Sequence, residues 1–523
     1  MSTKGQNPKK RQVNLLRRKE PCFIVQFPLR AEDFQEDILN KRFEIGRKIY
    51  NALVTVTQKR YKEMQKTKLY RTTMEQLVIV NNDINNCNKE NQEKMETLSL
   101  ERKSKLNILN DLRSEYRINE YAFHEDVKTM QKYFKTNIDS FTAQKIATRL
   151  WESYNDLIFG DGREIHYKRF GTLNSLEGKS NASGIRFRDN ILYWNGLKIP
   201  VQIDYNNPYE SMAMQSKIAY CRIIRKYING KYKFYLQIIF RGIAPPKIDK
   251  ETGTFKRLMG VGDVGLDIGI QTVAISSNST VQIYELADKV QNIENEKRRI
   301  QHKMDRSRRS MNADNFNEDG TIKEQIGKRT VWVKSKRYLK LQSRLRELYR
   351  KQADIRKLQH EIMANNFVAL GDRFLVETMN FNGLQKRAKK TEKNEKGRYK
   401  RKKRFGKSIA KKAPAMFLEI LDRKLKSHGT QLYKIDTKSV KASQYNHVED
   451  NNKKKKLSQR WNYINGKKVQ RDMYSAFLIM NVNDDLKTIN KEKCDNRYSN
   501  FLNLHDLEVQ KLTGRENLNS IAI

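Results

Sequence analysis

The chain has few cysteines, and none lies close in sequence to another. They are Cys22, Cys87, Cys221 and Cys494, so no Cys-x-x-Cys pair occurs, and the histidines show no His-x₃₋₅-His spacing. Disulfide scaffolds and cysteine-based zinc sites need such pairs. We therefore expect a cytoplasmic protein with reduced thiols and no zinc.

Long apolar runs are also missing. No run approaches the ~18–20 apolar residues that a membrane-spanning helix needs. The N-terminal segment from Met1 to Glu20 is basic and polar, without the apolar stretch of a secretory signal. We therefore expect neither membrane insertion nor secretion.

Acidic residues are too few to balance the basic ones. The chain of 523 residues has 105 Lys and Arg against 60 Asp and Glu, a formal net charge of +45. This charge is far larger than solubility requires. It predicts a polyanionic partner, with nucleic acid as the first choice and an anionic membrane surface as the alternative.

Three acidic residues lie where apolar neighbours favour burial. Asp267 lies in the strand-like run from Val264 to Ser276, Glu377 ends a second such run, and Asp472 begins an apolar helical pattern. Burying an unpaired carboxylate is costly, so each needs a partner or a metal. Carboxylates on separate elements suit paired Mg²⁺ ions that act on a phosphodiester. Taken singly, Asp267 also fits a strand end and Asp472 a helix N-cap.

The segments around these acids resemble the three RuvC motifs of TnpB-type transposon-encoded RNA-guided nucleases, whose relatives are the compact type V CRISPR effectors. The matching segments are Gly265-Leu-Asp-Ile-Gly-Ile270, Val376-Glu-Thr-Met-Asn-Phe381 and Gln470-Arg-Asp-Met-Tyr-Ser-Ala476. The resemblance extends from Arg186 to Phe477.

The resemblance implies that Asp267, Glu377 and Asp472 are catalytic and hold Mg²⁺, with two ions expected. Asp263 competes for the first position, because an even separation puts it on the same strand face as Asp267. Asp267 is preferred because the Ile-Gly of the motif follows it.

The segment 437–468 corresponds to an element in which the family often carries two cysteine pairs. Ser443-Gln444 and Leu457-Ser-Gln-Arg460 match the surroundings of that element, but its cysteines are missing, so we expect no zinc here. Arg460 aligns with an arginine expected near the scissile phosphate, where it would stabilise developing charge. A surface arginine in a basic loop is an equally good interpretation. A small hairpin packed through Trp461 and Tyr445 is expected to keep Arg460 near the acids.

The fold class that follows is α+β and multidomain. We expect an RNase H-like (RuvC) nuclease domain, a small antiparallel β-barrel resembling the family's wedge domain, and an inserted helical recognition lobe. The predicted parts are a basic disordered tail (1–20), the first barrel strand (21–30), the helical lobe (31–160), the rest of the barrel (161–257), the nuclease domain with a helical hairpin and a basic lid loop at 386–412 (258–436), the insert resembling a target-nucleic-acid-binding element (437–468), and the third motif with the C-terminal tail (469–523).

The function implied by the resemblance is that of an RNA-guided DNA endonuclease in a prokaryotic cytoplasm. A guide RNA would read target DNA by base pairing, and the protein would recognise a short flanking motif. An RNA-guided repressor that does not cut is one alternative, and the three filled acidic positions argue against it. A conventional RNase H-fold transposase or resolvase is another, and the helical lobe and barrel argue against that. The guide's origin, the flanking motif and the oligomeric state stay open.

Overall fold

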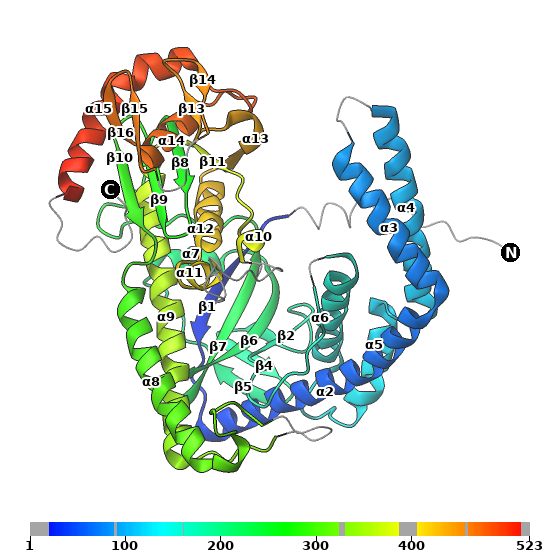
Figure 1. The fold of residues 1–523 in the computed structure, drawn as a ribbon. Helices are drawn as coiled ribbons and strands as arrows, with labels where there is room; N and C mark the ends of the chain where they lie inside the picture. Colours follow the sequence, from blue (N-terminus) through cyan, green and yellow to red (C-terminus); the bar gives the residue numbers. More distant parts are fainter. Residues whose placement is uncertain are drawn as a thin grey trace. The chain divides into compact units, whose positions relative to one another are not determined.

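The computed structural model describes residues 20–87, 92–160, 162–323, 330–385, 405–454 and 459–513. It is a mixed α/β structure with long helices and several small sheets (Figure 1). Internal contacts divide the chain into two compact units, Met1–Pro245 and Pro246–Ile523. Among the described residues, no helix has the length and apolar character needed to cross a membrane. The predicted tail at 1–20 lies outside the described residues except for Glu20.

The first unit has its long helices between its first two strands, in the part where the sequence predicts a helical lobe. These helices are α2 (Asp33–Lys66), α3 (Lys68–Asn86), α4 (Gln92–Glu115), α5 (Glu120–Lys132) and α6 (Ser140–Phe159) (Figure 1). Polar side chains define their starts: Asn119 caps α5 and Asp139 caps α6 by accepting backbone N–H bonds. The polar composition of Asn81–Lys94 favours a loop, but α3 continues past its last buried residue, Val80, to Asn86, and α4 begins at Gln92.

The sheets of the first unit join the start of the chain to the region after the helices. One sheet has the order β1-β7-β6-β2 and the other β3-β4-β5. The bounds are β1 (Cys22–Pro28), β2 (Ser175–Glu177), β3 (Arg186–Arg188), β4 (Ile191–Trp194), β5 (Leu197–Pro200), β6 (Ile218–Ile228) and β7 (Lys231–Arg241), with the short helix α7 (Pro208–Met214) before β6. Strand β1 pairs antiparallel with β7, with Phe23 opposite Phe240, so it lies in the same sheet as strands from after the helices. The closed barrel stays a prediction, because these pairings form two sheets linked by one bridge between Leu29 and Val201.

The second unit is built on a five-stranded sheet of order β10-β9-β8-β11-β12. The strands are β8 (Asp263–Ile268), β9 (Thr272–Ser276), β10 (Val281–Glu285), β11 (Arg373–Glu377) and β12 (Leu432–Ile435). The first three are antiparallel, whereas β11 runs parallel to both β8 and β12. The central strands alternate little between polar and apolar residues, as expected for a sheet covered on both faces.

Helices cover both faces of this sheet. One apolar cluster joins the sheet to α9 and α12, and another joins it to α14 and α15. The helices of this unit are α8 (Val290–Met311), η1 (Ala313–Asn315), α9 (Lys336–Val368), α10 (Phe381–Gln385), α11 (Gly406–Lys412), α12 (Pro414–Ser427), α13 (Thr437–Val440), α14 (Arg471–Met480) and α15 (Lys491–Thr513) (Figure 1). Two small hairpins precede α14: β13 (Tyr445–Asn446) with β14 (Asn451–Asn452), and β15 (Trp461–Ile464) with β16 (Lys467–Gln470).

The predicted helical hairpin corresponds to α8 and α9, which pack together. Apolar residues recur along α9 at helical spacing and favour one buried stripe, but two of them are exposed. Leu358 and Ile362 are 59% and 49% exposed. Polar residues take inward positions instead: Gln352 accepts a hydrogen bond from Lys297, and His360 Nε2 lies 2.8 Å from the Lys412 carbonyl oxygen. Most of the predicted lid, residues 386–404, lies outside the described residues, and α11 forms its end.

Candidate active site

Asp267 and Glu377 end two neighbouring parallel strands. The register of β8 and β11 pairs Leu266 with Val376, so the next residue on each strand, Asp267 and Glu377, lies at the same edge of the sheet. Both side chains are half-buried. The carboxyl ends of parallel strands therefore bring two of the three predicted acids together.

Helix α14 brings the third acid to the same edge. A Cβ atom added at Gly265 would lie 2.0 Å from the Ala476 carbonyl oxygen and 2.3 Å from the Met480 backbone nitrogen, so α14 lies directly against β8. Only glycine allows this approach. Asp472 lies one turn before Ala476, in the first turn of the helix, and thereby faces the end of β8 where Asp267 lies.

The three acids interact electrostatically. Burial, followed by repulsion from Asp472 and Glu377, raises the pKa of Asp267 well above its ordinary value, while Arg471 and Ser475 act in the opposite direction. Burial also raises the pKa of Glu377. The site therefore concentrates negative charge in a partly desolvated place, which a bound cation would stabilise.

Two arginines face Asp472. Arg471 Nη2 lies 3.0 Å from Asp472 Oδ1, and Arg460 Nη1 lies 3.5 Å from Asp472 Oδ2. The structure therefore brings Arg460 to the three acids, next to the residue at the start of α14. The Arg460 side chain is 39% exposed and that of Arg471 only 13%. The sequence patterns did not indicate a role for Arg471, although it directly precedes the third acid.

The donor set fits Mg²⁺ in its chemistry, because hard cations prefer carboxylate oxygens. Within the described ranges, however, no group of three His, Cys, Asp or Glu side chains is already arranged to hold a metal ion. The Asp472 oxygens face Arg471 and Arg460 in this structure. Metal ligation by all three acids therefore requires the Asp472 carboxylate to exchange an arginine for the metal.

Asp263, the competing candidate, has a different environment at the other end of β8. Its Oδ1 lies 2.8 Å from Arg373 Nη1 and its Oδ2 lies 3.1 Å from Arg497 Nη1. Burial alone would raise the pKa of Asp263, but the two arginines lower it below its ordinary value. Asp263 is therefore an ion-paired residue that links β8, β11 and α15.

We expect Asp263→Ala to lower the free energy of unfolding by about 1–3 kcal/mol at neutral pH, because Arg373 and Arg497 lose a partly buried partner. Since the folded pKa of Asp263 is lowered, its contribution is present above the unfolded pKa and is lost as the pH falls through the folded pKa. Denaturant unfolding at neutral pH and below about pH 4 measures the difference in free energy of unfolding between wild type and variant. A difference that stays constant into acid would contradict the ion-pair explanation.

The hairpin before α14 turns at Asn465-Gly466 but does not have the predicted packing through Trp461 and Tyr445. Ile464 and Val469 are its buried apolar residues, whereas Trp461 is partly exposed. Side chains alternate along a strand, so the burial of Asn462 and Ile464 turns Trp461 to the other face. Tyr445 lies in the other hairpin, where its hydroxyl donates to Asp450.

An aromatic core orders the insert around His447. The His447 ring is buried, its Nδ1 lies 2.6 Å from the Tyr474 hydroxyl oxygen, and the rings of Phe477 and Tyr498 pack around it. The absence of zinc stays a prediction. Metal analysis of chelator-washed protein is expected to find less than one zinc per chain, because this segment has no cysteine ligands. One tightly bound zinc that His447→Ala removes would contradict it.

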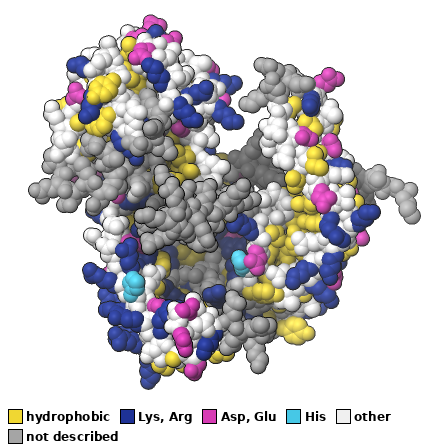
Figure 2. All heavy atoms as spheres, viewed as in Figure 1, with side chains coloured by type: hydrophobic (Ala, Val, Ile, Leu, Met, Phe, Trp, Pro, Cys, Tyr) yellow, Lys and Arg dark blue, Asp and Glu magenta, His cyan; other side chains and the backbone are white. Residues whose placement is uncertain are grey.

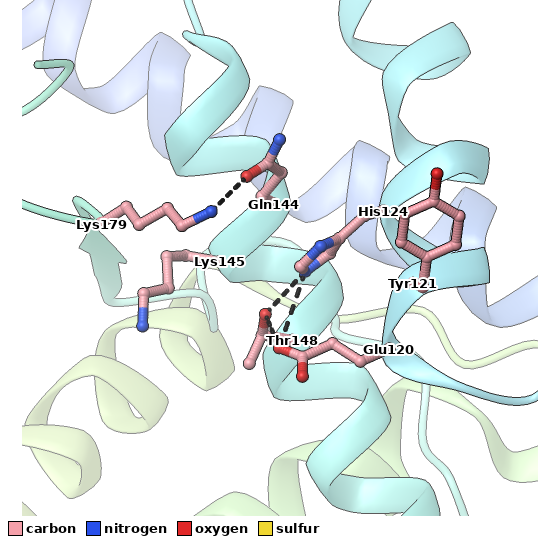
Figure 3. Close-up of a pocket in the computed structure, with 7 residues that line it drawn as sticks. All are labelled: Glu120, Tyr121, His124, Gln144, Lys145, Thr148 and Lys179. Carbon is pink, nitrogen blue, oxygen red and sulfur yellow. Dashed lines mark hydrogen bonds and ion pairs between the residues drawn. The ribbon is translucent and has the colours of Figure 1, made fainter. Parts of the chain in front are cut away.

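A polar recess of about 380 Å³ lies in the first unit, between α5, α6 and the segment after β2. Figure 3 shows the lining residues, which are Glu120, Tyr121, His124, Gln144, Lys145, Thr148 and Lys179. Several of their polar groups bond to one another: Thr148 donates to Glu120 and Lys179 donates to Gln144. The two lysines, His124 and Glu120 of the recess are therefore engaged with neighbouring side chains.

Comparison with known proteins gives a distant structural similarity. No protein-family model matches the chain, and no curated protein matches it. Among solved structures, the chain is similar to a chain in the structure described as "Cryo-EM structure of CRISPR-Cas12f Ternary Complex", at 13% identity, with 86% of each chain covered and a TM-score of 0.23. Structural similarity at this level carries no argument about function.

Proposed function

We propose that this chain is an RNA-guided DNA endonuclease that hydrolyses DNA at a single Mg²⁺-dependent RuvC-type site. The observation that carries the proposal is the meeting of three acids: Asp267 and Glu377 at the carboxyl ends of neighbouring parallel strands, and Asp472 in the first turn of α14, which lies directly against β8. The same three residues occupy the acidic positions of the segments that resemble RuvC motifs. Three antiparallel strands followed by two parallel ones, with helices on both faces, also suit an RNase H-like domain.

Asp267, Glu377 and Asp472 are the residues that would hold the Mg²⁺ ions. Bound Mg²⁺ would supply Lewis-acid stabilisation of the phosphoryl oxygens and a nucleophilic water. The positive charge of a bound ion would also favour the ionised form of Asp267, whose pKa burial and the neighbouring acids raise. Glu377 pairs with Ile435 of β12, and the residue before it, Val376, pairs with Leu266 of β8, so the sheet holds this end of β11.

The two arginines are assigned different roles. Arg471 is largely buried, contacts Asp472 Oδ1 and donates from Nη1 to the Gln459 carbonyl oxygen, so it holds the start of α14. Arg460 is more exposed and its contact with Asp472 is longer, at 3.5 Å. Arg460 is therefore the guanidinium that can leave the carboxylate and donate to a phosphate oxygen as charge develops there.

The nucleic-acid partners follow from charge and from the resemblance. A net charge of +45 suits a protein that binds both RNA and DNA along their phosphates. Figure 2 shows Lys and Arg side chains spread over the visible face, including the surface of α8. That the bound nucleic acids are a guide RNA and target DNA is inferred from the family resemblance of the RuvC-like segments.

The proposal is tested by expressing the chain together with its native flanking DNA and sequencing the RNA that copurifies. We expect a defined RNA, and we expect the purified complex to cut a DNA duplex that contains its complement in the presence of Mg²⁺. Guided binding without cutting would instead support a repressor. Cutting that survives removal of the RNA would support a conventional transposase or resolvase.

Arg460→Ala is expected to slow single-turnover cleavage about 10²-fold or more, because one preorganised donor to the phosphoryl group is lost. Binding of matched DNA should change little. Arg423→Ala is the matched control, since Arg423 is an exposed, ion-paired arginine on α12 of the same unit. Equal cleavage rates of the two variants would place Arg460 among ordinary surface arginines.

A further inference from the structure

The start of α14 depends on one buried residue, Gln470. Gln470 is both the last residue of β16 and the N-cap of α14, and its side-chain Oε1 accepts a hydrogen bond from the Met473 backbone N–H at 2.8 Å. Its own backbone N–H needs an acceptor, because the residue is buried and water does not reach it. The acceptor comes from α15, 35 residues further along the chain.

That acceptor is the His505 ring. The Gln470 backbone nitrogen lies 3.0 Å from His505 Nε2, and His505 Nδ1 lies 2.7 Å from Asp506 Oδ1. A backbone N–H can only donate, so Nε2 must be the unprotonated nitrogen. Nδ1 then carries the proton and donates to Asp506, which selects this tautomer.

The ring has little freedom to leave this position. His505 is only 1% exposed, and its ring packs against those of Phe501 and Trp461 at centroid distances of 5.7 and 6.4 Å. Burial also lowers the pKa of His505, which favours the neutral ring that the geometry requires. Asp506, in contrast, has a side chain that is 65% exposed.

We infer that His505, oriented by Asp506, is a positioning residue for the Asp472 carboxylate and thereby for its divalent metal. The inference rests on the proposed function. It assigns to α15, which lies outside the three RuvC-like segments, a chain of hydrogen bonds from Asp506 through His505 and Gln470 to the first turn of α14.

The physical reason is the short path from Gln470 to Asp472. Only one residue, Arg471, lies between Gln470 and Asp472, and the N-cap bond of Gln470 fixes the same turn from the other side. Asp472 must keep its place opposite Asp267 while it exchanges an arginine for a metal. Shifts of ~1 Å in such groups cost about 10²-fold in rate, and loss of an outer hydrogen-bond partner typically costs 10–100-fold in metal affinity or activity.

Three variants of the full chain test the inference. His505→Phe keeps the ring volume and removes the acceptor, whereas His505→Gln replaces it with an amide oxygen that can accept from Gln470. Asp506→Ala removes the group that selects the tautomer, and it lies at an exposed position where folding should tolerate the change.

The readouts are Mn²⁺ binding to the protein, the Mg²⁺ dependence of cleavage, thermal unfolding, and the ¹⁵N signals of selectively labelled histidine. We expect His505→Phe to weaken Mn²⁺ binding about 10–100-fold and His505→Gln to recover most of the loss. We expect Asp506→Ala to weaken the protonated-Nδ1 signature of His505, to lower the unfolding temperature less than His505→Phe does, and to need more Mg²⁺ for cleavage.

The inference is overturned if His505→Phe lowers only the unfolding temperature, while its folded fraction binds Mn²⁺ and responds to Mg²⁺ like wild type. It is also overturned if Asp506→Ala shifts the tautomer without changing the Mg²⁺ dependence. If the proposed function is wrong, the wild-type protein has no Mn²⁺ binding that depends on Asp267. The Asp267→Asn variant then binds as much Mn²⁺ as wild type. That result would overturn both proposals, and it is distinguishable from the other two.

Discussion

Asp267→Asn is expected to abolish DNA cleavage, with a loss of about 10³-fold or more, while guide RNA and target DNA stay bound. The substitution preserves the size of the side chain and removes the carboxylate that interacts electrostatically with Glu377 and Asp472. Glu377→Gln and Asp472→Asn should have the same effect, because the three acids act as one ligand set. Single-turnover cleavage at saturating protein, alongside a filter-binding assay, measures both quantities.

The matched control is Asp263→Asn, which changes the same residue type on the same strand. Asp263 is ion-paired with Arg373 and Arg497, so this variant should lose stability and keep cleavage in its folded fraction. If Asp263→Asn lost cleavage and Asp267→Asn retained it, the first acid would be wrongly assigned. Asp267→Asn should also stabilise the protein in the absence of divalent cations, because it removes a partly buried charge that its neighbours repel.

Affinity for nucleic acid is expected to fall about 10³–10⁵-fold between ~50 and ~200 mM salt, as for proteins that contact six to ten phosphates. The reason is the large excess of Lys and Arg, 105 against 60 acidic residues, which releases condensed counterions on binding. Equilibrium binding of matched DNA and of guide RNA across a salt series gives the slope of log affinity against log salt.

A slope near zero would contradict the assignment of the charge to phosphate binding. The Asp267→Asn and wild-type proteins should give the same slope, because the acidic site is distinct from the cationic surfaces that bind phosphate. A change of slope in that variant would mean that the acids themselves control binding, rather than chemistry after binding.

Local patterns were sufficient to predict the elements that carry the acids. In the structure, the short β-branched run around Asp267 and the run ending at Glu377 both form strands. The apolar pattern after Asp472 forms a helix. Their convergence was expected only through the family resemblance, because strand order is not encoded in any one segment. The close approach of α14 to Gly265 is the tertiary contact that brings Asp472 to Asp267.

Features that depend on packing between distant segments were not predictable in the same way. The apolar spacing of α9 suggested a stripe that includes Leu358 and Ile362, yet polar groups with buried partners, such as His360, take the inner face. Trp461 is the largest residue of its hairpin, but strand alternation turns it away from the main core. The contact of His505 with Gln470 joins residues 35 positions apart, and no local motif indicates it.

The most direct measurement is cleavage of a labelled DNA duplex that contains the complement of the copurified RNA, followed as Mg²⁺ is titrated. The account predicts cutting that needs both the matching sequence and Mg²⁺, that stops when the metal is chelated, and that is absent in Asp267→Asn at every Mg²⁺ concentration. Cutting of unmatched DNA at the same rate, or cutting that persists in Asp267→Asn, would contradict it.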